Sequence, residues 1–325
     1  MSNLDEMFMH DLHAQKLHSE FRENKRTEEQ IQELFSALGY ENVPSSILSR
    51  LSKLSCIEGL NVQNRNSHFQ DAVEISELID NLVADYEMTE SEMNELRFAC
   101  LVHDVGKSGP SEATPEQQQA FVDIFNLKFN QYVYLVKNYQ VTPSELTLEK
   151  ALEIKVEEGA LSAERAKEII ALVVEASKHQ EIKRFETKIT PKIRMGLFWS
   201  AHVFWTYDIL RDQGIDEKIT DVASSHHMID GSDPARIGME NVSPQMASLE
   251  LVDKYQAFRV RLILADKYQA FRIRGAKSHE ETVSILKKII FERLANNLKA
   301  LTLYMEALEL IDKNKEIFEK ELDLA

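Results

Sequence analysis

Two pairs of adjacent polar residues in this chain have the side chains that metal chemistry requires. His103 and Asp104 directly follow a short apolar run, and His226 and His227 form the second pair. Adjacent polar groups at the ends of buried helices are costly unless they have partners. Imidazole and carboxylate groups bind divalent iron, manganese and zinc. The two pairs are therefore candidate metal ligands.

A carboxylate beside a histidine can bridge two metal ions. Two ions about 3.5–4 Å apart can activate a water for attack on a phosphodiester. A single histidine is more often a hydrogen-bonded residue of the core or the surface, but two such pairs in one helical chain favour a metal site. By contrast, His10, His13 and His18 lie on a charged segment, where we expect surface residues.

The elements that position these residues are predicted to be helices. The 325 residues include only 10 glycines and 7 prolines, well below their usual combined share of about 12%. Few turn-forming residues argue against a sandwich, a barrel or a Rossmann fold. Thr27 and Thr89 begin segments with apolar residues at helical spacing, and Gly39 ends the first of them. The expected fold class is all-α.

The chain divides into a small N-terminal helical domain over residues 1–55 and a larger domain over residues 56–325. The N-terminal domain carries no chemical motif, and a sensory or dimerisation role fits it. Within the larger domain, residues 249–261 are repeated almost unchanged at 262–274, which is typical of a local tandem duplication.

Composition excludes several classes of protein. With 54 acidic against 38 basic residues, the net charge of −16 disfavours nucleic-acid binding, which depends on phosphate neutralisation. No apolar run reaches the roughly 18 residues of a membrane-spanning helix, and the first residues do not resemble a signal peptide. Two cysteines in different contexts, Cys56 and Cys100, exclude a disulfide framework. We expect a cytoplasmic protein.

Taken in order, the motifs resemble the HD-GYP branch of the HD phosphohydrolases over about residues 60–285. The His-Asp-x-Gly-Lys element after an apolar helix is the most specific part, and the order of all the elements strengthens it. The matching segments are Ser67-His68, His103-Asp104-Val105-Gly106-Lys107, His202, His226-His227 with Asp230-Gly231, and an Asp in an Asp-x-Tyr-x-Ala context.

The resemblance implies an HD-domain helical bundle with a two- or three-metal centre, usually of iron or manganese. It also implies hydrolysis of cyclic di-GMP to pGpG or GMP. Asp104 would bridge the metals and act with Lys107 in catalysis, and Lys107, Arg274 and Lys277 would bind substrate phosphate. The metal ligands carried over from the family pattern are His68, His103, Asp104, His202, His226, His227 and Asp253.

Two of these assignments have rivals. His179 competes with His202, but its Lys-His-Gln-Glu context is typical of a solvated segment. Asp266 is the copy of Asp253 in the duplication, and on one continuous helix the two would lie about 20 Å apart. Asp253 lies at the family's spacing from the histidine pair, whereas Asp266 lies closer to the family's spacing from the downstream segment 277–281. We favour Asp253 and keep Asp266 as the alternative.

The chain departs from the family pattern at three places. The segment 226–234 is shorter than the family's and lacks the Gly-Tyr pair that names it. Asn64 stands where three-metal members carry a glutamate, so we expect two metals. Asp104 and His202 are 98 positions apart, which indicates a helical insertion over about 111–185. The insertion could be a lid, a partner surface or a packed helical hairpin.

These observations lead to one principal function hypothesis and two alternatives. The principal hypothesis is a phosphodiesterase that hydrolyses cyclic di-GMP at two divalent ions, iron or alternatively manganese. A weak or inactive receptor or signalling scaffold would instead bind the cyclic dinucleotide without turnover. A third hypothesis is an HD phosphohydrolase for another nucleotide. A signalling partner would bind through the insertion or the N-terminal region.

Overall fold

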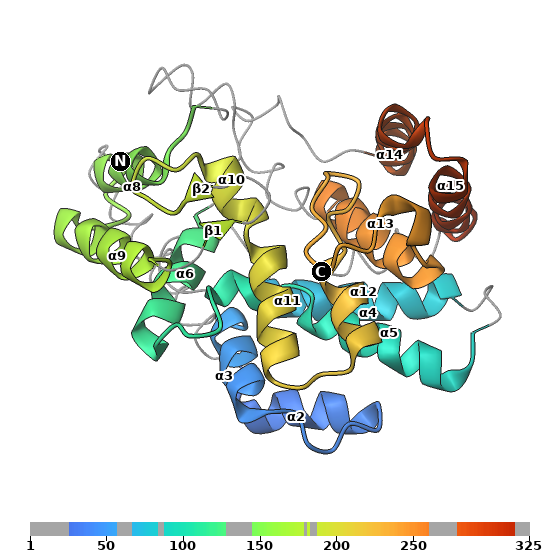
Figure 1. Cartoon of the computed structure of the whole chain (residues 1–325), viewed down its shortest axis with the longest axis horizontal. Coiled ribbons are helices and arrows are strands. Elements are labelled where there is room, and N and C mark those ends of the chain that lie inside the picture. Colours follow the sequence, from blue (N-terminus) through green and yellow to red (C-terminus); the bar gives the residue numbers. More distant parts are fainter. Residues whose placement is uncertain are drawn as a thin grey trace, which may run out of the picture.

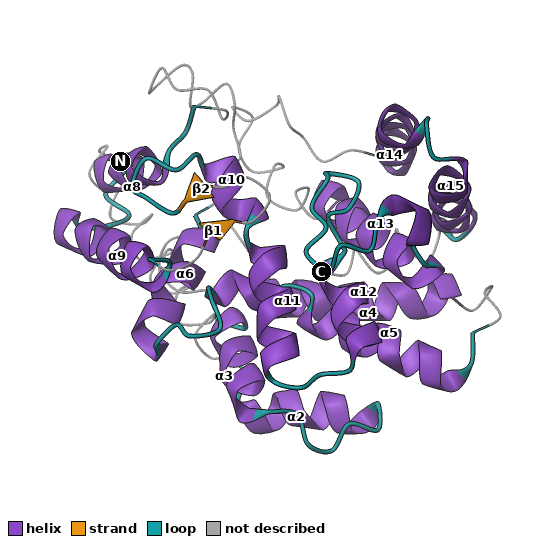
Figure 2. Cartoon of the chain, in the orientation of Figure 1, coloured by secondary structure: helices purple, strands orange, loops and turns teal. Residues whose placement is uncertain are grey.

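The computed structural model describes residues 26–56, 67–83, 88–127, 145–178, 181–182, 187–259 and 278–315. Within these ranges the chain is all-α, as the composition predicts, apart from one antiparallel ribbon of two two-residue strands (Figure 2). No helix in the described ranges has both the length and the apolar character needed to cross a bilayer. The elements up to the ribbon are α2 (Glu28–Ala37), α3 (Ser45–Leu54), α4 (His68–Val83), α5 (Glu90–Val102), the 3-10 turn η1 (Val105–Ser108), α6 (Pro115–Phe125), α8 (Leu148–Glu157), α9 (Ala163–Ala176), β1 (Glu181–Ile182) and β2 (Thr187–Lys188).

The second half of the chain adds the helices that complete the centre of the molecule. In Figure 1, α4, α5, α11, α12 and α13 lie in the middle, with α8 and α9 on one side and α14 and α15 on the other. These later elements are α10 (Met195–Ser200), α11 (His202–Asp212), α12 (Glu217–Ser224), η2 (Met239–Asn241), α13 (Pro244–Arg259), α14 (His279–Leu294) and α15 (Leu298–Lys313).

Polar caps begin several of these helices where the sequence predicts a start. Thr27 and Thr89 accept a hydrogen bond from the backbone N–H three residues later, and the side chains of Gln30 and Glu92 bond back to them. Each capping box satisfies two backbone donors that have no partner within the helix. The two predicted helix starts are therefore confirmed.

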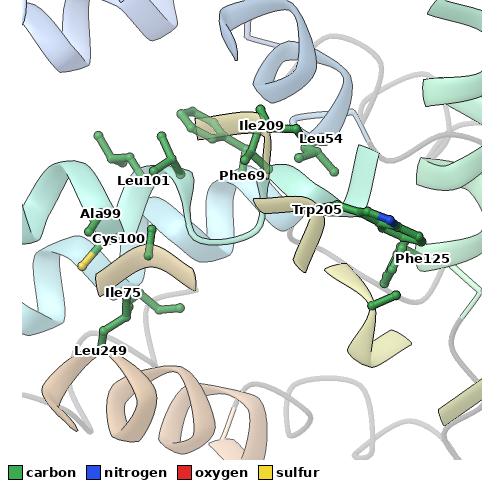
Figure 3. Packing of buried hydrophobic residues seen from close by; sticks show 14 of the residues in the cluster. Leu54, Phe69, Ile75, Ala99, Cys100, Leu101, Phe125, Trp205, Ile209 and Leu249 are labelled. Atoms are coloured by element: carbon green, nitrogen blue, oxygen red, sulfur yellow. The ribbon is translucent and has the colours of Figure 1, made fainter. Parts of the chain in front are cut away.

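Helices distant in the sequence share one hydrophobic core. Figure 3 shows buried side chains contributed by α3 (Leu54), α4 (Phe69), α5 (Cys100), α11 (Trp205) and α13 (Leu249). The N-terminal helices α2 and α3 thus contribute to the same core as the larger region. The domain boundary at residue 55 stays a prediction.

The described part of the 111–185 segment packs against the site-bearing helices through aromatic side chains. Phe121 lies 5.0 Å from Trp205 of α11 between ring centroids, and Phe125 lies 5.8 Å from the His202 ring. An ion pair of 2.8 Å between Arg165 and Asp123 ties α9 to α6. These helices are therefore packed on the body, whereas a lid or partner-binding role stays a prediction.

Gly106 allows η1 to lie directly against α11. A Cβ atom at Gly106 would lie 2.0 Å from the carbonyl oxygen of His202 and 2.5 Å from the backbone nitrogen of Thr206. The Gly106 N–H donates to Thr206 Oγ1 at 3.0 Å, and that hydroxyl donates to the His103 carbonyl at 2.9 Å. The missing side chain thereby brings two histidine-bearing segments together.

Gly106→Ala should destabilise the protein by about 1–3 kcal/mol or more, because a methyl group has no room between η1 and α11. Gly196→Ala is the matched control, since Gly196 is exposed in α10 and a Cβ there meets nothing within 4 Å. Urea unfolding of both variants measures the difference. Equal unfolding midpoints for the two variants would contradict this packing.

Candidate metal centre

The candidate ligands lie in or directly after α4, α5, α11, α12 and α13, and these helices lie in the middle of the molecule (Figure 1). Most of them stand at helix ends, where the chain can turn a polar side chain inward. His68 begins α4, His103 and Asp104 follow α5, Lys107 lies in η1, His202 begins α11, His226 and His227 follow α12, and Asp253 lies in α13.

One carboxylate oxygen of Asp104 faces the histidines of α11 and the end of α12. Its Oδ1 lies 3.3 Å from His202 Nε2 and 3.7 Å from His226 Nε2. Ring nitrogens of His202, His226 and His227 all lie within 4.8 Å of one another. The first donor group therefore consists of three imidazoles, and two of them, His202 and His226, lie beside Oδ1 of Asp104.

The other oxygen of Asp104 faces a second donor group. Its Oδ2 lies 3.5 Å from His103 Nε2 and 4.0 Å from His68 Nδ1, and His103 Nε2 lies 3.9 Å from Asp253 Oδ1. Lys107 Nζ donates to Asp104 Oδ2 and lies 3.2 Å from His68 Nδ1. Asp104 thus lies between two groups of donors, as a bridging carboxylate would.

Three histidines have their ring orientation set by the backbone. Nδ1 of His103, His202 and His226 each bonds a carbonyl three residues earlier. A carbonyl oxygen only accepts, so Nδ1 carries a proton, and a ring in its neutral form then presents a lone pair at Nε2. The acceptors are, in order, the carbonyls of Cys100, Trp199 and Ala223 at 2.7, 2.6 and 2.8 Å.

Two of these lone pairs point at each other, which fits a site that holds a cation. Burial lowers the pKa of His202, and it lowers the pKa of His226 further. Both rings are therefore neutral, yet their Nε2 atoms lie 2.9 Å apart. Two imidazoles bound at right angles to one metal, at about 2.1 Å each, would place their nitrogens about 3 Å apart.

His103 adds a second mark of a metal ligand. Its Nε2 is buried and has no hydrogen-bond partner among the described residues. A buried polar atom without a partner costs free energy, and metal-binding histidines commonly bond the backbone through the other nitrogen. The residues present therefore fit divalent metal.

Asp104 stays charged in this environment. Burial by itself would raise the pKa of its carboxyl group, but positive charge at the site, that of the Lys107 ammonium foremost, outweighs burial and holds the pKa well below its usual range. An ionised carboxylate has lone pairs on both oxygens, which is what a bridging ligand requires.

His227 is oriented by a side chain rather than by the backbone. Its Nδ1 lies 3.1 Å from Asp230 Oδ2, which also accepts from Lys254 Nζ at 2.5 Å. Burial raises the pKa of Asp230, but the bonds from His227 and Lys254 outweigh burial and lower the pKa strongly. A carboxylate on the second ring nitrogen raises the basicity of a ligating histidine.

The turn after the histidine pair is held by a buried glutamate that the sequence analysis missed. Glu250 of α13 accepts from the backbone N–H of Ile229 at 2.9 Å and from the hydroxyl of Tyr304 of α15. Burial raises the pKa of this fully buried carboxyl. The duplication held a usable signal, because Glu250 is the position at which the second copy has Ile263.

Eight of the sequence-predicted site residues lie in this cluster. They are His68, His103, Asp104, Lys107, His202, His226, His227 and Asp253. The alternatives His179 and Asp266, and the expected phosphate-binding residues Arg274 and Lys277, lie outside the described residues, as does Asn64.

His226→Ala should remove most bound metal, because His226 Nε2 lies close to His202 and His227 and also to His103 and Asp104. We expect the metal affinity to fall by more than the 10–100-fold that is typical when a residue hydrogen-bonded to a metal ligand is mutated. His279→Ala is the matched control, since His279 is equally buried but bonds Tyr255 and Asp312 away from the cluster. The measurement is the metal content of both variants after anaerobic purification. Equal metal content in the two variants would refute the site.

The metal-free protein should lose stability as the pH falls below about 6.5. The pKa values of His202 and His226 are lowered in the folded state, whereas the unfolded chain takes up protons near pH 6.5. The unfolded state then binds more protons, and each group costs up to about 1.4 kcal/mol per pH unit.

Urea unfolding of chelator-treated protein at pH 7.5, 6.5 and 5.5 measures this loss. In His226→Ala the slope against pH should be shallower, because one of the two depressed histidines is gone. An unfolding free energy that is constant between pH 7.5 and 5.5 would contradict the expectation.

Comparison with protein-family models, with curated proteins and with solved structures gives no match. The structure by itself shows an all-helical protein with a buried group of histidine and aspartate side chains that could hold metal ions.

Proposed function

We propose that this protein is a metal-dependent phosphodiesterase with a dinuclear centre, and that its substrate is cyclic di-GMP. The observation that carries the proposal is the placement of Asp104, whose two oxygens face two different groups of nitrogen and oxygen donors. The substrate assignment rests on the motif order that resembles the HD-GYP phosphodiesterases.

The two donor groups would each hold one ion and share Asp104 as the bridge. When bound, two divalent cations lower the pKa of a water between them and withdraw charge from a phosphate. Iron is the expected metal and manganese the alternative, since imidazole and carboxylate donors accept both and availability selects between them. One group would be His68, His103 and Asp253, and the other His202, His226 and His227.

Protein side chains would orient the nucleophile and the phosphate. The ionised Asp104 can accept a hydrogen bond from the attacking water and so fix its direction. Lys107, whose pairing with Asp104 is partly open to solvent, can turn its ammonium to a phosphate oxygen and offset developing negative charge. Arg274 and Lys277 would extend this positive region.

One side of the cluster is accessible, as a substrate site requires. The side chains of Lys107, Asp253 and His227 are 18, 22 and 27% exposed, whereas those of His103 and His226 are 1% exposed. An anionic substrate would therefore approach over Lys107 and reach the metal ligands from that side.

The loop after the histidine pair is the reason that a receptor function is the second candidate. Its Asp233 carboxylate accepts from the backbone N–H groups of Ile237 and Gly238 at 2.9 and 2.8 Å, which closes the loop on itself. This loop lacks the Gly-Tyr pair of the HD-GYP pattern. A protein with this loop could bind a cyclic dinucleotide without turnover.

Lys107→Ala should keep its metal but lose about 100-fold or more in turnover, because the ammonium acts on the phosphate. Asp104→Asn should lose metal and turnover together. Lys150→Ala is the control, since Lys150 pairs only with glutamates of its own helix α8 in the described structure. The assay follows release of pGpG or GMP from cyclic di-GMP by metal-loaded protein.

The substrate panel separates the hypotheses. Metal and nucleotide binding without product would favour the receptor, and turnover only of other phosphodiesters or phosphomonoesters would favour a different HD phosphohydrolase. Wild-type protein that binds neither metal nor cyclic dinucleotide would refute all three.

A further inference from the structure

We propose that Arg50, on the N-terminal helix α3, is a positioning residue for the turn that carries Asp104 and Lys107. The inference deepens the proposed function and rests on it. It would make the N-terminal helices a structural part of the metal site rather than a separate appendage.

Arg50 is a charged side chain in an unusual place. It is 2% exposed, and its guanidinium donates to a run of backbone carbonyls. A buried charge is tolerated only when its donors are satisfied. The carbonyl acceptors are Ser108 at 3.3 Å, Gly109 at 3.2 Å, Pro110 at 2.8 Å and Ser111 at 2.8 Å, and Ser108 Oγ also accepts at 2.8 Å.

The loop is shaped around this guanidinium. Four successive carbonyls can converge on one side chain because Gly109 has a φ of +83°, in the left-handed region that favours glycine. A Cβ at Gly109 would lie 2.3 Å from the Phe121 ring, so α6 closes the loop from the other side. Arginine presents five donors in a fixed fork, whereas lysine has three on one atom and cannot reach the same acceptors.

The loop in turn holds η1. Ser108 is the last residue of η1, and its hydroxyl accepts from Arg50 while it donates to the Val105 carbonyl at 2.6 Å. Asp104 is the residue that precedes η1, and Lys107 lies within it. A displacement of Ser108 would therefore move both proposed catalytic residues.

Two different helices thus clamp η1. Thr206 of α11 bonds the Gly106 N–H on one side, and Arg50 of α3 bonds Ser108 on the other. Burial lowers the pKa of Arg50 only to about 10, so the guanidinium remains charged at neutral pH. The contact on the α11 side comes from the helix that also carries His202. The contact on the α3 side comes from the N-terminal region.

Arg50→Lys should weaken Co²⁺ binding about 10–100-fold and alter the visible absorption spectrum of the Co²⁺-substituted protein, because Asp104 would shift relative to the histidines. The spectrum reports ligand geometry, which a loss of stability alone would leave unchanged in the folded fraction. Leu54→Ala is the matched control, since Leu54 is also buried in α3 but bonds nothing at η1. It should be less stable yet keep the wild-type spectrum and affinity.

Ser108→Ala is the second variant, to be used if Arg50→Lys does not fold. It removes the hydroxyl between Arg50 and Val105, and we expect a smaller change of the same kind in spectrum and affinity. Wild-type Co²⁺ affinity and spectrum in folded Arg50→Lys or Ser108→Ala would overturn the inference. Wild-type protein that binds no Co²⁺ would instead refute the proposed function, so the two failures are distinguishable.

Discussion

The buried carboxylate of Asp104 is the interaction on which the site depends. Removing a charge from water is costly, and here the Lys107 ammonium offsets much of that cost, while imidazoles lie on both sides of the group. Because each oxygen faces a different set of donors, the helices that carry those donors must meet at this point. The packing of α4, α5, α11, α12 and α13 can be understood as the scaffold for one ionised group.

The histidines around Asp104 are oriented to bind a cation rather than to form hydrogen bonds with one another. His202 and His226 each donate through Nδ1 to the backbone, so their Nε2 lone pairs face each other at 2.9 Å. Lone pairs at that distance repel when both rings are neutral. The hydrogen bonds to the backbone carbonyls therefore hold the two Nε2 atoms in an unfavourable contact. A divalent ion bound between them would remove the repulsion.

Part of this site could be predicted from sequence because it depends on neighbours along the chain. His103 and Asp104 are adjacent and directly follow an apolar run, which places both beside the core at the end of α5. Other parts could not be predicted, because they depend on residues far away in the sequence. Arg50 reaches its carbonyls across about 60 positions, and a buried arginine in a polar-looking helix gives no sign of its target.

The sequence by itself determined the helical class and the helix starts at Thr27 and Thr89, since these follow from local spacing and residue chemistry. It indicated the full set of candidate ligands only through the order of motifs that resembles the HD-GYP pattern. Only the tertiary structure decided which oxygen of Asp104 faces which histidines, and that Glu250 holds the turn after His227. Helix propensity acts within a few residues, whereas the direction of a buried side chain is set by every helix packed around it.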